Sequence, residues 1–147
     1  MLKETIKFTD FEGKPSQEIA YFNLSKVDAV RLSAKWGAED EEGHKTLVEG
    51  LQQLAVSGDD VKMVDAIEDI LLTAYGQRVP GGKVFERNAE LRSKFENGPA
   101  YAELFIGFLN DPQSFTQFAG NLFADTSAEG GAKPVMTLIG GTAAKVD

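Results

Sequence analysis

The sequence predicts an α+β fold that is mostly helical: an N-terminal β-hairpin packed on a bundle of about five to six helices, with a flexible C-terminal tail. Three observations predict it. Apolar and polar residues alternate near the start, apolar residues then recur with helical spacing as far as residue 124, and residues 125–147 contain no aromatic side chain. A chain of 147 residues is long enough for one domain with its own core. We therefore expect a domain over residues 1–124 and a Gly/Ala-rich tail over residues 125–147.

The hairpin is predicted from two short apolar segments with turn residues between them. Ile6 and Phe8 fall on one face of the first segment, and residues 18–24 are rich in β-branched and aromatic side chains. Gly13 and Pro15 lie between them, where glycine adopts turn conformations easily and proline cannot donate to a strand ladder. Because an isolated hairpin is only marginally stable in water, its apolar face should pack on the helices that follow.

Capping residues place the first helices. Ser25 and Asp28 have the spacing of a capping box, and we expect that helix to end near Gly37. The acidic stretch 38–43 is interpreted either as a link or as the first turn of the next helix, which an apolar stripe predicts over residues 44–56.

The clearest helical periodicity lies between residues 60 and 76, followed by a Pro/Gly-rich loop over residues 77–83. Asp65, Glu68 and Asp69 lie opposite the apolar stripe of this helix. Neighbouring carboxylates of this kind can serve in a metal or acid–base site, but no second set of ligands accompanies them in the sequence. We therefore interpret them as a solvated face.

The last third of the chain is predicted to form three helices, beginning at Asn88, Pro99 and Pro112. Its aromatic residues are core candidates first. Their density exceeds what a small domain readily hides, so a surface for a partner helix or for another copy of the chain is the alternative. The candidate partner-binding residues are Tyr101, Phe105, Phe108, Phe115, Phe118, Leu122 and Phe123.

The tail is expected to be flexible because it has too few large apolar residues to offset the entropy of ordering. Residues 134–139 are its apolar exception. They are interpreted either as a segment that docks or adds a strand, or as a disordered apolar patch.

Composition excludes several kinds of site. There is no cysteine and one histidine, His44, so thiolate chemistry and multi-histidine metal sites cannot be built from this chain. Lys and Arg number 15 and Asp and Glu 23, which gives a formal charge of −8. That charge disfavours binding to nucleic acid or to anionic membranes. We expect no catalytic residues, no metal site and no cofactor.

A family resemblance emerges from several short segments taken together. The chain resembles the tail assembly chaperones of long-tailed phages (siphophage type), of the kind common in phages of Gram-positive hosts. The resemblance covers about residues 1–123. The segments that carry it are Asp10-Phe11-Glu12-Gly13, Tyr21-Phe22-Asn23-Leu24-Ser25-Lys26, Ile67 to Gly76, Gly82-Lys83-Val84-Phe85, Leu91 to Phe95 and Ala100 to Phe105.

The resemblance implies a small, acidic, non-enzymatic protein of the host cytoplasm that is absent from the mature virion. Its implied partner is the tape measure protein, which it keeps soluble while the tail tube assembles. A longer frameshifted form of the chain, copies of the chain itself and the tail tube protein are further implied partners.

Two other classes of function compete with this interpretation. An acidic inhibitor or DNA-mimic module would need its carboxylates gathered on one face, whereas the sequence spreads them along the chain. An enzyme would need an unrecognised site with strongly shifted carboxylate pKa values, since the sequence has no catalytic motif.

Overall fold

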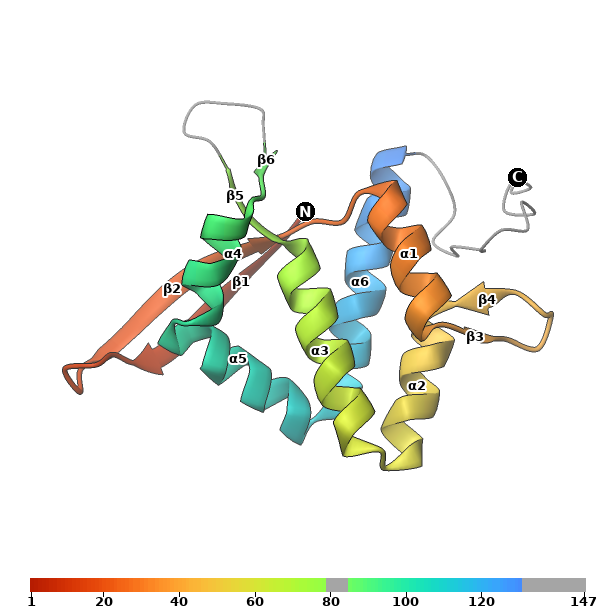
Figure 1. Cartoon of the computed structure of the whole chain (residues 1–147), viewed down its shortest axis with the longest axis horizontal. Helices are drawn as coiled ribbons and strands as arrows, with labels where there is room; N and C mark the ends of the chain where they lie inside the picture. The colour runs from red at the N-terminus through yellow and green to blue at the C-terminus, as the bar shows by residue number, and fades with distance from the viewer. Residues whose placement is uncertain (79–84, 131–147) are drawn as a thin grey trace.

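The computed structural model describes residues 1–78 and 85–130, which form an N-terminal hairpin and a helical body (Figure 1). The predicted mostly helical α+β fold with an N-terminal hairpin is confirmed. The elements in chain order are β1 (Leu2–Thr9), β2 (Pro15–Phe22), α1 (Lys26–Trp36), β3 (Ala38–Glu39), β4 (Lys45–Thr46), α2 (Leu47–Ser57), α3 (Asp60–Ala74), β5 (Tyr75–Arg78), β6 (Phe85–Glu86), α4 (Ala89–Glu96), α5 (Pro99–Asn110) and α6 (Pro112–Gly130).

The hairpin belongs to a larger sheet than the sequence predicts. β1 and β2 pair antiparallel along their whole length, and the four-stranded order is β1-β2-β5-β6. β5 joins through Tyr75 and Gly76, which face Phe22 and Tyr21. The helix expected to run to Gly76 therefore ends at Ala74, and the predicted loop begins after the strand. Its Pro80-Gly81-Gly82 core lies outside the described residues.

The acidic stretch 38–43 forms neither a helical turn nor a plain link. Its first two residues form β3 and the rest begin the turn to β4, so the two short strands make a second small hairpin. This hairpin projects from the side of the helical body away from β1 and β2 (Figure 1). The helix expected from residue 44 begins at Leu47, where the Thr46 hydroxyl accepts a hydrogen bond from the backbone N–H of Glu49.

Several predicted helix ends are confirmed by their caps. The Ser25 and Asp28 side chains each accept a hydrogen bond from the other's backbone N–H, which completes the capping box of α1. Asn88 caps α4, and Pro99 opens α5. α6 continues to Gly130, six residues beyond the predicted domain end at 124.

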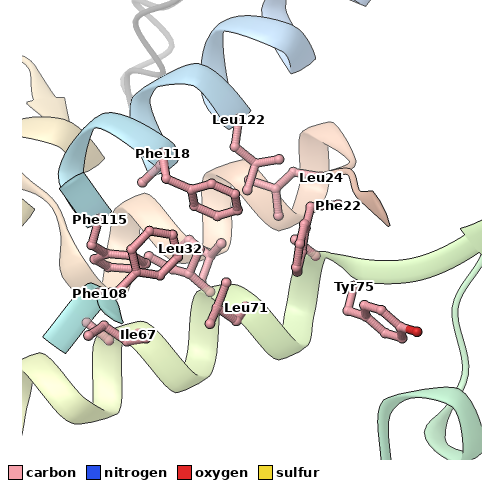
Figure 2. Close-up of a cluster of buried hydrophobic side chains, with 14 of the residues drawn as sticks. Phe22, Leu24, Leu32, Ile67, Leu71, Tyr75, Phe108, Phe115, Phe118 and Leu122 are labelled. Carbon is pink, nitrogen blue, oxygen red and sulfur yellow. The ribbon is translucent and has the colours of Figure 1, made fainter. Parts of the chain in front are cut away.

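The core lies where α1, α2, α3, α5 and α6 meet one another and the sheet, and Figure 2 shows part of it. Phe22 of β2 is fully buried and its ring lies edge-on to that of Phe118, with centroids 5.3 Å apart. Ile67 and Leu71 of α3 are also fully buried, as the helical periodicity predicts. In residues 1–78 and 85–130, no helix has the length and hydropathy needed to cross a bilayer.

Candidate partner-binding surface

The seven candidate partner-binding residues lie on α5 and α6, and burial separates them into two groups. Phe105 is half-buried, and the other six are at most 9% exposed. The buried six are Tyr101, Phe108, Phe115, Phe118, Leu122 and Phe123. Six of the seven therefore serve the core of the folded chain. That any of the seven contacts a partner stays a prediction.

The buried aromatic rings pack on one another. The Phe108 centroid lies 5.3 Å from that of Phe115 and 5.1 Å from that of Phe118. Both spacings fall in the range where aromatic pairs are stabilising. These rings face Ile67 and Leu71 of α3 and Leu32 of α1 (Figure 2). Most aromatic side chains in the last third of the chain are therefore buried in the core.

α5 nevertheless presents apolar side chains to solvent. Ala102, Phe105, Ile106 and Leu109 recur at positions i, i+3, i+4 and i+7, which places them along one side of the helix. Ile106 is 49% exposed, Ala102 is exposed, and the other two are half-buried. We call these four residues the α5 outer face. Depletion of charge with exposed apolar groups is typical of the central part of protein interfaces.

Charge is scarce throughout this part of the chain. Between residues 97 and 124 only Glu103 and Asp111 are charged, whereas 26% of the whole chain is charged. A hollow of about 510 Å³ between α2 and α6 continues this pattern, because Asp111 is its one charged lining residue. The remaining lining consists of amides, hydroxyls, a glycine and Val48.

A second and larger hollow, of about 710 Å³, lies between α1 and α3 and is highly charged. Its α1 wall carries Arg31 and Lys35, and its α3 wall carries Asp65, Glu68 and Asp69. The three carboxylates predicted to form a solvated face thus line a groove, and Asp69 has specific partners. It accepts a hydrogen bond of 2.8 Å from the Trp36 indole N–H and pairs with Lys35 at 3.2 Å.

Two arginines from the segment around α4 line this groove at the C-terminal end of α3. Arg87 donates to Asp28 at 2.7 Å and to the Thr73 carbonyl at 2.6 Å, while Arg92 donates to the Leu72 carbonyl at 2.7 Å. Both carbonyls belong to the last turn of α3, where such groups lack helical partners. These arginines were not predicted as site residues, because nothing near them in the chain marks the end of α3 as the group that they bind.

Asp28 remains ionised inside this network. Burial alone raises the pKa of its carboxyl, but hydrogen bonds from the Ser25 backbone and from Arg87 outweigh that effect and lower it. Its side chain is 7% exposed. An ion pair with this degree of burial and this many partners positions α1, α3 and α4 relative to one another.

The β3–β4 turn gathers Asp40, Glu42 and His44, whose ligand atoms lie within 4.8 Å of one another. Asp40 Oδ1 accepts 2.9 Å hydrogen bonds from the backbone N–H groups of Glu42 and His44. These bonds, that from His44 first, lower the pKa of Asp40. The hydrogen bonds to Asp40 are those of an Asx-type turn, so formation of the β3–β4 turn accounts for its position.

Comparison with known proteins identifies the family. The family model for phage tail assembly chaperones matches residues 1–125, which include β1 to β6, α1 to α5 and all but the last five residues of α6. No curated protein and no solved structure matches the chain. The match covers most of the chain and the same segment as the resemblance found in the sequence. The chain belongs to the phage tail assembly chaperone family.

Proposed function

We propose that this chaperone binds the tape measure protein and keeps it soluble while the tail tube assembles. It does so by binding alone, without catalysis, in the host cytoplasm, and it leaves before the virion is complete. The observation that carries the proposal is the α5 outer face, which is apolar. Glu103 is the one charged residue of the whole helix α5. A long helical protein that exposes apolar stripes would find a matching surface there.

The rest of the molecule supports this role through charge. A complex that carries the formal charge of −8 repels other complexes of the same kind and stays dispersed. Residues 97–124 carry little of this charge, and they include the α5 outer face, where the proposed partner would bind. The longer frameshifted form, copies of the chain and the tail tube protein remain proposed partners of the same body.

Co-expression tests both the function and the surface. The tape measure protein is expressed alone, with the wild-type chain, and with two variants that each add one lysine, Ile106→Lys and Val61→Lys. Val61 is 72% exposed on α3 and Ile106 is 49% exposed on α5, so neither substitution disturbs the core. Soluble tape measure protein is measured after centrifugation.

We expect the wild-type chain and Val61→Lys to raise the soluble yield several-fold and Ile106→Lys to lose most of that gain. An unchanged yield with the wild-type chain would contradict the proposed function. A gain that Ile106→Lys retains in full would leave the function in place and remove the α5 outer face as its surface.

A further inference from the structure

α1 exposes apolar side chains on a side that no other helix of residues 1–78 and 85–130 covers. Val27 is 72% exposed and Val30 is 45% exposed, and Ala34 follows them as an exposed residue one turn later. The spacing i, i+3, i+7 places the three on one side of the helix, which we call the α1 stripe. The opposite side carries the buried residues Ala29 and Leu32.

The end of α6 is held next to the start of this stripe. Thr126 is 4% exposed, and its hydroxyl donates to the Leu24 carbonyl at 3.2 Å and to the Leu122 carbonyl at 3.0 Å. Leu24 lies three residues before Val27 in the chain. The last turn of α6 therefore lies beside the first turn of α1, as Figure 1 shows near the top of the helical body.

We propose that the apolar run of residues 134–139 docks on the α1 stripe. Seventeen residues follow Gly130, and within them Pro134-Val135-Met136-Thr137-Leu138-Ile139 has no charged side chain. Val135 is the fifth residue after Gly130, and five residue steps span at most about 18 Å when extended. The α1 stripe is about 10 Å long, so the run reaches all of it from the end of α6.

Among the exposed valines, those of α1 lie nearest the end of α6. Val56 and Val61 lie at the end of α2 and the start of α3, which Figure 1 places at the opposite end of the helical body from the end of α6. Covering Val27 and Val30 removes apolar surface from water on both partners, and the short tether keeps the local concentration of the run high. The chain thereby supplies its own cover for α1, independently of any partner bound to α5.

Disulfide trapping tests the contact directly because the chain contains no cysteine. Full-length Val27→Cys/Leu138→Cys is compared with full-length Val61→Cys/Leu138→Cys. The matched positions are each 72% exposed. Closure of the intramolecular disulfide is followed at low micromolar protein in a glutathione redox buffer, by thiol alkylation and non-reducing electrophoresis.

Proximity of the tether alone would favour the Val27 pair, so a third variant is decisive. It adds Val135→Ser, Met136→Ser and Ile139→Ser to the Val27 pair, which keeps the tether and removes the apolar contact. We expect the Val27 pair to close about tenfold faster than the Val61 pair and the serine variant to lose that advantage. Equal closure with and without the serines, or disulfides only between two chains, would overturn the proposal.

Discussion

Arg87 joins the start of α1 to the end of α3, with its Nη1 2.7 Å from Asp28 Oδ2 and 2.6 Å from the Thr73 carbonyl oxygen. One cation thus neutralises a buried carboxylate and satisfies a helix-terminal carbonyl. Arg31 also donates to Asp28, at 2.9 Å, but its side chain is 61% exposed, whereas that of Arg87 is 26% exposed. The two arginines therefore make unequal contributions to the same carboxylate.

Arg87→Met should lower the free energy of unfolding by about 2 kcal/mol, because it leaves Asp28 with less compensation and the Thr73 carbonyl without a partner. Arg31→Met is the matched control and should lower it by less than about 1 kcal/mol. Urea unfolding followed by circular dichroism measures both. Equal losses for the two variants would contradict the assignment of the buried pair to Arg87.

Glu18→Gln should stabilise the fold at pH 7 and leave it unchanged near pH 4. Glu18 has no carboxylate-binding partner among the described residues, and partial burial raises its pKa above the ordinary value. The charged form is thus disfavoured in the folded state. The resulting penalty is present above the folded pKa and disappears once the pH falls below the unfolded one.

Thermal unfolding of wild type and Glu18→Gln across pH 4 to 7 measures this difference, which should stay within about 0.5 kcal/mol for a group that water still reaches. Gln17→Glu, on the exposed side of the same strand, should lack the pH-dependent gain or loss. A gain that is the same at pH 4 and pH 7 would exclude the carboxylate as its source.

Phe115→Ala should lower the free energy of unfolding by about 3–5 kcal/mol, because its ring is fully buried among other core side chains. Ile106→Ala, in the neighbouring helix, should change it by less than about 1 kcal/mol. Chemical denaturation distinguishes the two. Similar small effects at both sites would mean that the aromatic rings of α6 are not core residues.

Two glycines in helices should respond oppositely to alanine. A Cβ at Gly50 of α2 would lie 1.9 Å from the Trp36 carbonyl oxygen, so Gly50→Ala should destabilise the fold by about 2 kcal/mol or more. A Cβ at Gly107 of α5 would meet nothing within 4 Å, so Gly107→Ala should stabilise it by about 0.5–1 kcal/mol. Melting temperatures of the pair measure the sign, and a stabilising Gly50→Ala would rule out this close helix approach.

Local signals in the sequence predicted much of the fold. The Ser25–Asp28 capping box and Pro99 at the start of α5 act within one helical turn, so the sequence alone reveals them. Strand β5 escaped prediction because its partners, Tyr21 and Phe22, lie more than fifty residues away. Without knowledge of that pairing, the sequence predicts that the preceding helix continues to Gly76.

The candidate site was harder to predict for a related reason. Periodicity showed that Phe115 and Phe118 share a helix face, but it could not show whether that face meets the core or a partner. The deciding quantity is the apolar area that the rest of the fold presents, here from Phe22, Leu32 and Ile67. The roles of Arg87 and Arg92 were likewise not predictable, because each binds a group that is distant in the sequence.

The hydrogen bond from Thr126 to the Leu24 carbonyl spans 102 residues, and it has a consequence for the order of folding. The hairpin leaves the ribosome first, yet the Phe22 ring finds its Phe118 neighbour only when α6 has been synthesised. Contacts of such high sequence separation form late and slow folding. Tyr75 and Phe95 can pack on Phe22 before α6 is made, but the cover of this strand stays incomplete until the last helix of the described residues has been synthesised.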